Sequence, residues 1–169
     1  MILEKVALGG TFSFFHAGHR HLLRSALEIG KTVVVGVTSD EFARSLGKAH
    51  PIEPYELRAL RVLRYCLRKA KNGQRIMIVP LDDVGGPASS DPSIEAIVAT
   101  EETAIRAIEV SLSRAKRGLK PAIVIAVEPV LGADGRPISS TKLWLAYASA
   151  LRNVEARRSL GEPTPQSVF

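Results

Sequence analysis

The stretch Gly9–His19, GGTFSFFHAGH, separates an apolar strand from an amphipathic helix. We expect the strand at Lys5–Leu8 and the helix from about Gly18 to Ile29, where Gly30 follows as a stop signal. A buried strand that turns into an amphipathic helix is typical of a parallel α/β sheet. This loop therefore suggests the fold class, and the rest of the chain shows whether the alternation continues.

The alternation of strands and helices continues along the chain. Three further apolar runs predict strands buried on both faces, at Thr32–Val37, Arg75–Leu81 and Pro121–Leu131. Around them we expect a short helix and loop at Thr38–Lys48, a helix at Glu53–Lys71, a loop at Asp82–Ser93, a short strand or helix at Ile94–Thr100, a helix at Glu101–Arg117, and a last helix from Ser140 through Leu151. This order predicts an α/β fold, a Rossmann-like doubly wound parallel sheet in three α/β/α layers. Ligands of such sheets bind beyond the carboxyl ends of the strands, so the loop after the first strand is where chemistry is expected first.

The helix predicted at Glu53–Lys71 carries two neighbouring stripes. Four leucines share one face and four arginines lie beside them: Leu57, Leu60, Leu63 and Leu67, with Arg58, Arg61, Arg64 and Arg68. Such spacing is typical of an amphipathic helix. We interpret the arginine stripe as a solvated face, with Arg58 as the exception considered below.

The composition is that of one ordinary soluble domain. Of the 169 residues, 46% are hydrophobic and 24% are charged, which suits one folded unit at residues 1–160 and a loosely held tail at 161–169. No apolar run is long enough to cross a bilayer and the N-terminus lacks a signal-peptide pattern, so no membrane partner is expected. The single cysteine, Cys66, excludes an internal disulfide and a cysteine metal cluster. A reducing, cytoplasmic location is the expectation.

The charge of the chain favours a partner that carries phosphate. The formal net charge is +6, but this value alone does not choose between a nucleotide and a nucleic acid. Lysine and arginine are scattered, and aromatic residues, at 5%, are few for stacking on bases. We therefore expect no nucleic-acid partner, while a nucleotide- or RNA-binding module on a Rossmann-like scaffold stays as an alternative of a different class. The sequence does not indicate an oligomeric state.

The opening loop has the properties of a phosphate site. Gly9 and Gly10 let backbone amides approach an anion closely, and Thr11 adds a hydroxyl donor. The helix that begins near Gly18 directs its free N–H groups and positive end to the same place. His16 and His19 lie three residues apart across the helix start, from where their imidazoles can donate hydrogen bonds to phosphoryl oxygens.

Two better-known phosphate loops do not match this stretch. The dinucleotide-binding fingerprint needs a third glycine, and a P-loop needs GKS or GKT after its last glycine. Neither is present between Gly9 and His19. A dehydrogenase or a P-loop kinase is therefore disfavoured.

A second hydroxyl-rich helix start follows the last predicted strand. Ser139, Ser140 and Thr141 offer three hydroxyl groups and free amides, which also suits phosphate. The plainer interpretation is N-capping, with Ser140 as the cap. Taken with the first loop, the two helix starts can hold opposite sides of one triphosphate.

These residues together resemble a known family. The segments are VALGGTF at Val6–Phe12, HAGHRHLL at His16–Leu23, EIGKTVVVGVTSDEFARSLGK at Glu28–Lys48, PYELR at Pro54–Arg58, IVPLDD at Ile78–Asp83, DPSIEAIVATEET at Asp91–Thr103, RGLKP at Arg117–Pro121 and GADGRPISSTK at Gly132–Lys142. They are similar to the nucleotidyltransferase superfamily with an HxGH signature and an ISST motif, and within it to the archaeal-type phosphopantetheine adenylyltransferases.

The resemblance implies a reaction and its participants. A nucleotidyltransferase domain at residues 1–160 would move AMP from ATP to 4′-phosphopantetheine, giving dephospho-coenzyme A and pyrophosphate. Mg²⁺ would bind mainly through the ATP phosphates, with no metal ligands from the protein. The alternative within the superfamily is a cytidylyltransferase or a mononucleotide adenylyltransferase, which would share both phosphate loops.

The resemblance also implies roles for individual residues. His19, His16 and Lys48 would be catalytic. The nucleotide would contact Gly9, Gly10, Thr11, Phe12, His16, His19, Glu102, Ser139, Ser140 and Thr141. The acceptor would contact Thr11, Ser13, Lys48 and Arg58. Two positions depart from the family pattern, because Ser13 stands where related sequences commonly have Asp, and Leu143-Trp144 follows Lys142 where a second basic residue is usual.

Overall fold

The computed structural model describes residues 2–159, and the tail predicted at 161–169 lies outside the described residues. In chain order the elements are β1 (Leu3–Gly10), α1 (Ala17–Ile29), β2 (Gly30–Thr38), α2 (Asp40–Ser45), α3 (Tyr55–Lys69), β3 (Arg75–Leu81), α4 (Gly86–Ser90), β4 (Ala96–Thr100), a 3₁₀ turn η1 (Glu101–Thr103), α5 (Ala104–Lys116), β5 (Ile123–Val127) and α6 (Ser140–Ser159).

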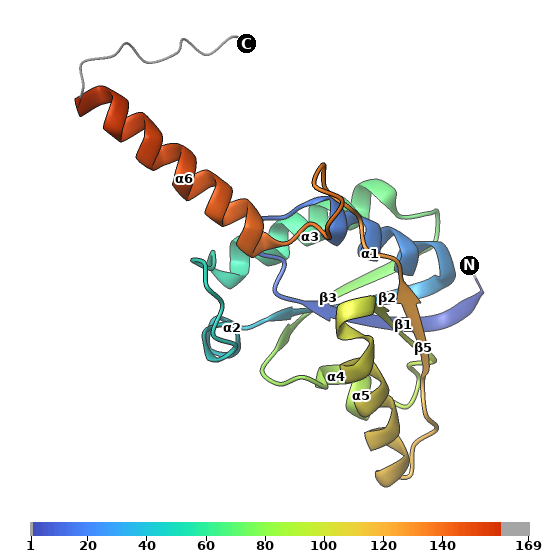
Figure 1. The fold of residues 1–169 in the computed structure, drawn as a ribbon. Coiled ribbons are helices and arrows are strands. Elements are labelled where there is room, and N and C mark those ends of the chain that lie inside the picture. The colour runs from blue at the N-terminus through green and yellow to red at the C-terminus, as the bar shows by residue number, and fades with distance from the viewer. Residues whose placement is uncertain (1, 160–169) are drawn as a thin grey trace.

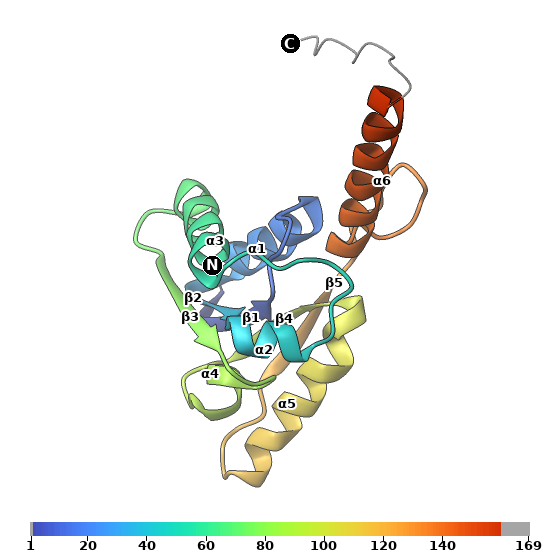
Figure 2. The ribbon, with the colours of Figure 1, turned by 90° about the vertical axis from the view of Figure 1, so that its left-hand side faces the viewer.

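The strands form one parallel sheet in the order β3-β2-β1-β4-β5. The chain runs outward from β1 through β2 to β3, then returns to place β4 on the other side of β1. The order therefore reverses beside β1, which is the point where α/β sheets bind ligands. Helices α1 and α3 cover one face, and α4 and α5 cover the other (Figures 1 and 2). The predicted three-layer, doubly wound architecture is confirmed.

The core explains why the strand after α1 is apolar at successive positions. Val33, Val35 and Val37 pack into the larger cluster on the side of α1 and α3, whereas Val34 points to the opposite face and packs with Ala7. A strand covered on both faces has no polar side, so its sequence is continuously hydrophobic and does not alternate between apolar and polar residues.

Helix α3 turns a different face to the sheet than its leucines suggest. Leu57, Leu60 and Leu67 are exposed, and the buried face of α3 consists of Arg58, Val62, Tyr65 and Cys66. The spacing of these four residues also follows one helix face. Arg58 belongs to it because its guanidinium group finds buried acceptors, as described below.

Four smaller differences separate the structure from the sequence-based expectation. The predicted loop at Asp82–Ser93 contains the short helix α4, and the helix expected from Glu101 begins with the turn η1. Strand β5 is shorter than predicted, and beyond it Leu131 forms only an isolated bridge with Pro137. Helix α6 extends away from the sheet (Figures 1 and 2) and buries none of its residues.

Within the described part of the chain, no helix is long and apolar enough to span a membrane.

Candidate active site

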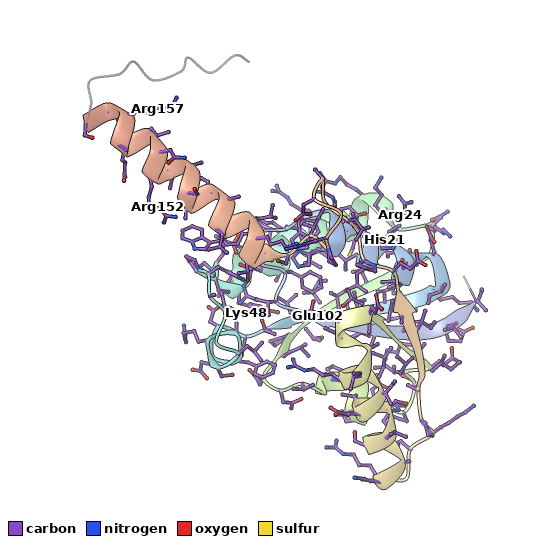
Figure 3. All side chains as sticks on the ribbon, in the orientation of Figure 1. His21, Arg24, Lys48, Glu102, Arg152 and Arg157 are labelled. Atoms are coloured by element: carbon purple, nitrogen blue, oxygen red, sulfur yellow. The ribbon has the colours of Figure 1, made fainter. Side chains whose placement is uncertain are left out.

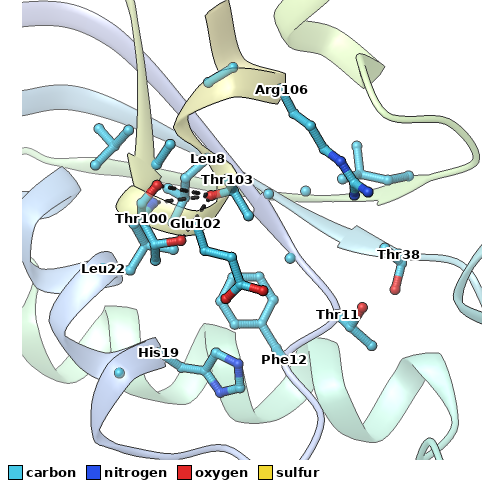
Figure 4. A pocket seen from close by; sticks show the side chains of 18 of the residues that line it. Leu8, Thr11, Phe12, His19, Leu22, Thr38, Thr100, Glu102, Thr103 and Arg106 are labelled. Carbon is cyan, nitrogen blue, oxygen red and sulfur yellow. Dashed lines mark hydrogen bonds between the residues drawn. The ribbon is translucent and has the colours of Figure 1, made fainter. Parts of the chain in front are cut away.

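A cavity of about 700 Å³ opens at the carboxyl ends of the central strands. It collects nearly all the residues that the sequence singled out, from segments far apart in the chain (Figure 4). The predicted site residues that line it are Gly9, Gly10, Thr11, Phe12, Ser13, His16, His19, Lys48, Glu102, Ser139, Ser140 and Thr141. Of the predicted set, Arg58 alone is not in its wall.

The two histidines build the start of α1. His16 is the N-cap residue, and its Nδ1 accepts a hydrogen bond of 3.1 Å from the backbone N–H of Gly18. In return, Nδ1 of His19 accepts one of 3.3 Å from the N–H of His16. The imidazole rings stack, with centroids 3.8 Å apart. A Cβ at Gly18 would lie 3.0 Å from Cε1 of His16, so this packing explains the glycine between the histidines.

The hydrogen bonds determine which nitrogen of each histidine can donate. Both Nδ1 atoms act as acceptors, so a neutral ring carries its proton on Nε2. Burial, followed by the charge of Arg20, lowers the pKa of His16 to about 4. Burial, followed by the neighbouring His16, lowers the pKa of His19 to about 3. Both imidazoles are therefore neutral hydrogen-bond donors near pH 7, in a cavity suited to an anion.

The loop between β1 and α1 has an unusual backbone. Phe12 and Phe14 have φ angles of +56° and +45°, a region that bulky side chains rarely adopt. Their rings are held by packing. The ring centroids of Phe12 and His19 are 5.2 Å apart, and those of Phe14 and His50 are 5.6 Å apart. The Phe14 ring also packs on Trp144 of α6, with a centroid distance of 5.8 Å. Strain that surrounding contacts hold in place is common at functional sites.

A carboxylate lies beside Ser13 although position 13 is not acidic. The Ser13 hydroxyl, which is buried, donates a 2.6 Å hydrogen bond to Oε2 of Glu53. The same oxygen accepts from the N–H of Phe14 at 3.3 Å, and Arg61 pairs with the other carboxylate oxygen. Burial raises the pKa of Glu53, but the hydrogen bonds from Ser13 and Arg61 outweigh it and bring the pKa below its usual value. Sequence reasoning did not find Glu53, which precedes the PYELR segment.

Arg58 lies beneath the cavity and supports its floor. The side chain is fully buried, and Nη1 donates hydrogen bonds of 2.9 Å to the carbonyl oxygens of Thr11 and Thr38. Nε donates to the carbonyl of Glu53 at 2.6 Å, and Nη2 pairs with Asp40 at 2.7 Å. The guanidinium group therefore joins β1, β2 and α3 below the site. The structure gives it a positioning contact to Thr11 and places it outside the cavity that would hold an acceptor.

The start of α6 forms the opposite wall of the cavity. Oγ of Ser139 accepts a 3.3 Å hydrogen bond from the N–H of Lys142, so the capping residue is Ser139 and not Ser140 as predicted. Ser140 instead donates a 2.6 Å hydrogen bond to the carbonyl of Ser13. This bond connects the second helix start to the first loop across 127 positions of sequence. The hydroxyl of Thr141 has no hydrogen-bond partner among the described residues and lines the cavity.

Besides Asp83, Glu101 and Glu128, three charged side chains line the cavity from other elements (Figures 3 and 4). Glu102 extends from η1 toward the space near His19 and Phe12, and Lys48 follows α2. Arg106 of α5, which the sequence-based reasoning missed, extends toward Thr11 and Thr38. One available signal was its spacing, because Arg106 lies four residues after Glu102.

The described residues contain no group of three or more histidine, cysteine, aspartate or glutamate side chains arranged to hold a metal ion. A cation that arrives on a triphosphate needs no such group, because Mg²⁺ keeps several waters and takes most of its ligands from phosphate oxygens.

Comparison with known families gives the class of protein. The profile of the cytidylyltransferase-like family matches residues 7–144, a span that begins in β1 and ends in α6. It includes both helix starts and every element of the sheet between them. The fold and the cavity are those of a cytidylyltransferase-like nucleotidyltransferase.

Individual relatives narrow this class. The chain is 44% identical over 140 residues to a phosphopantetheine adenylyltransferase of Methanopyrus kandleri, covering 83% of this chain and 88% of the relative. It is 43% identical over 138 residues to one of Methanothermobacter thermautotrophicus, covering 82% and 81% respectively. A solved structure of a protein with unknown function from Archaeoglobus fulgidus matches with a TM-score of 0.66 at 30% identity, covering 80% of this chain and 99% of that one. The chain belongs to the phosphopantetheine adenylyltransferase family.

Proposed function

We propose that this chain transfers the adenylyl group of ATP to 4′-phosphopantetheine, giving dephospho-coenzyme A and pyrophosphate. The observation that carries the proposal is the convergence of two helix starts on one cavity, in a chain 44% identical to a named phosphopantetheine adenylyltransferase. The proposed place of action is the cytoplasm, where this reaction's substrates are expected. The single cysteine, Cys66, is free and buried, which suits a reducing compartment.

The triphosphate of ATP fits between α1 and α6. Free N–H groups at both helix starts favour an anion, and the Nε2–H groups of His16 and His19 add two neutral donors. On the facing wall Thr141 has a free hydroxyl group, and Ser139 keeps its own proton because its oxygen is the capping acceptor. We assign the β- and γ-phosphates to this wall. Mg²⁺ would enter as part of the nucleotide and neutralise phosphate charge.

The acceptor fits the other half of the cavity. Beyond Lys48 the wall is mainly apolar, formed by Phe42, Leu46, Leu81, Val84 and Pro87 from the segments around β2 and β3. Such a surface suits a long, flexible arm whose charge is concentrated in one terminal phosphate. Lys48 and Thr11 lie where that phosphate would meet the nucleotide.

The proposed mechanism needs no general base. An oxygen of the acceptor phosphate attacks the α-phosphorus, the bond from this phosphorus to the bridging oxygen of the β-phosphate breaks, and pyrophosphate leaves. The nucleophile is already ionised near neutral pH, so the site works by alignment and by stabilising the negative charge of the transferring group. Donation from His19 strengthens as that charge grows. Lys48 reduces the repulsion between the two phosphate-bearing substrates.

The second candidate is a cytidylyltransferase, which the description of the matching family favours. It would use the same two helix starts and the same chemistry. The difference lies in which base the enzyme accepts, so a direct comparison of ATP with CTP separates the two candidates.

The test measures pyrophosphate release by the full chain with and without 4′-phosphopantetheine. We expect release that depends on the acceptor, with CTP at least about tenfold poorer than ATP in kcat/KM. The variant His19→Ala should lower turnover by about 100-fold, the scale of losing one transition-state donor. Arg24→Ala is the matched control on α1, because Arg24 is exposed and its one ion pair among the described residues is with Glu28. Preference for CTP, or release that ignores the acceptor, would overturn the proposal.

A further inference from the structure

We infer that Arg106 binds the terminal phosphate of the acceptor, which makes it a substrate-binding residue that no motif of the sequence marks. The inference rests on the function proposed above. Arg106 is in the first turn of α5 and lines the cavity. In Figure 4 its side chain extends from α5 toward Thr11 and Thr38, whereas His19 lies across the Phe12 ring.

The guanidinium group of Arg106 has no partner within residues 2–159. No hydrogen bond or ion pair joins it to another described side chain or carbonyl group. The two buried arginines differ in this respect, because Arg58 and Arg114 each donate to several backbone carbonyls. An unpaired guanidinium group that faces a cavity retains its donors for a ligand, and its planar pair of N–H groups suits a phosphate.

The direction of the side chain selects the acceptor over ATP. The triphosphate is assigned to the starts of α1 and α6, where His19 lies, and Arg106 points to the other side of Phe12 (Figure 4). That side contains Thr11, which follows β1, and Lys48, which follows α2, lines the same cavity. Arg106 follows β4 and Lys48 follows β2, so the two cations come from opposite sides of the central strand β1, and a phosphate at Thr11 would lie between those two parts of the sheet.

The site thereby provides two cations for an attacking phosphate that is doubly negative near neutral pH. Repulsion between this group and the triphosphate opposes their approach, and a charge-assisted hydrogen bond from Arg106 counteracts it. The contact exists whenever the acceptor is bound, so its loss should appear mainly in the KM for the acceptor rather than in kcat.

The experiment measures the kinetics of the full chain twice, first with 4′-phosphopantetheine varied at saturating MgATP and then with MgATP varied at saturating 4′-phosphopantetheine. Arg106→Ala should raise the KM for the acceptor by about tenfold or more, the scale of losing a hydrogen bond to a charged group. The KM for ATP should change by less than about twofold, and Arg106→Lys should restore part of the acceptor affinity. Lys116→Ala is the matched control, because Lys116 is exposed on the same helix and lies outside the cavity.

A second measurement isolates the phosphate. Pantetheine, which lacks the phosphate, is tested as a competitive inhibitor, and its inhibition constant should be the same for the wild type and Arg106→Ala. An unchanged KM for 4′-phosphopantetheine, an equal loss for both compounds, or a rise confined to the KM for ATP would each overturn the assignment. If the wild type releases no pyrophosphate with 4′-phosphopantetheine, the proposed function fails as well. If it does and the KM does not move, this inference alone fails.

Discussion

The stacked pair His16 and His19 shows at the scale of single residues how a site can make stability depend on pH. In the folded chain their pKa values are lowered to about 4 and about 3, mainly by burial. In the unfolded chain both return to the ordinary histidine pKa of 6.5. At pH values between the folded and the unfolded pKa, the unfolded state therefore binds protons that the folded state does not bind.

The pair therefore predicts a fall in stability under mild acid. Stability rises with pH wherever the unfolded state binds more protons, so the contribution is complete above about pH 6.5 and is lost as the pH falls toward 4. Each histidine accounts for at most about 1.4 kcal/mol per pH unit. Urea unfolding between pH 7 and 5 should show this slope, and His19→Gln should remove about half of it.

Two features make this measurement specific to the histidine pair. The carboxyl groups with lowered pKa values are Glu53, Asp91 and Asp134, and they bind most of their protons below about pH 5 in both the folded and the unfolded state, so they contribute little to the slope. His21→Gln is the matched control, because His21 lies on the same helix and has no ring contact with either histidine among the described residues. A slope that His19→Gln leaves unchanged would contradict the assignment.

Single residues also mark the limit of what the sequence can predict. The roles expected for His16 and His19 rested on a local pattern, and the structure places both in the cavity wall. The resemblance separated Arg58 from its solvated neighbours, but its burial could not be predicted, because it depends on carbonyl groups 20 and 47 positions away. Glu53 was missed for the same reason, since its partner Ser13 lies 40 positions earlier. Such long-range hydrogen bonds produce no periodic pattern in the amino-acid sequence.

At the scale of elements, α3 shows how a strong pattern misleads. Its leucines repeat at helical spacing, yet Leu57 and Leu67 are exposed by 48% and 61%. The face that meets the sheet combines Val62, Tyr65 and Cys66 with Arg58, and the charge of the arginine makes this face less hydrophobic than the leucine stripe in a count of apolar positions. The strands were easier to predict, because a parallel sheet covered on both faces requires uninterrupted apolar runs such as Thr32–Val37.

The start of α6 divides its hydroxyl groups between two tasks. A hydroxyl has one proton to donate, and Ser140 gives its proton to the carbonyl of Ser13. Thr141 has no such bond among the described residues, so it is the member best placed to donate to the triphosphate.

We therefore expect Thr141→Val to raise the KM for ATP by about three- to tenfold, the scale of one neutral hydrogen bond. Thr141→Ser, which keeps the hydroxyl group, should restore the wild-type value. Ser140→Ala should behave differently and impair kcat as well, because it releases the loop that carries Ser13. Steady-state kinetics with ATP varied measures both quantities. If Thr141→Val and Ser140→Ala changed kcat and the KM for ATP equally, the two hydroxyl groups would not have the separate roles assigned here.

At the scale of the whole molecule, α6 belongs to the site at one end only. Its first turns contribute Ser140 and the Trp144 ring that packs on Phe14. Beyond them the helix leaves the domain (Figure 1), and every residue from 151 to 159 is exposed. The family profile ends at residue 144, within the part of α6 that contacts the site.

This division predicts that the outer part of α6 can be removed without loss of the fold or the activity. A chain that ends after Leu151 loses no buried side chain among the described residues, and a lone helical segment adds little stability of its own. The melting temperature should stay within about 2 °C of the full chain, which corresponds to less than about 1 kcal/mol for a protein of this size. Trp144→Ala, at the attached end, should lower the melting temperature and raise the KM for ATP. Differential scanning fluorimetry and pyrophosphate release measure these effects. A drop of more than about 5 °C on truncation would show that the outer part of α6 packs against a partner, and size-exclusion chromatography would tell whether that partner is a second copy of the chain.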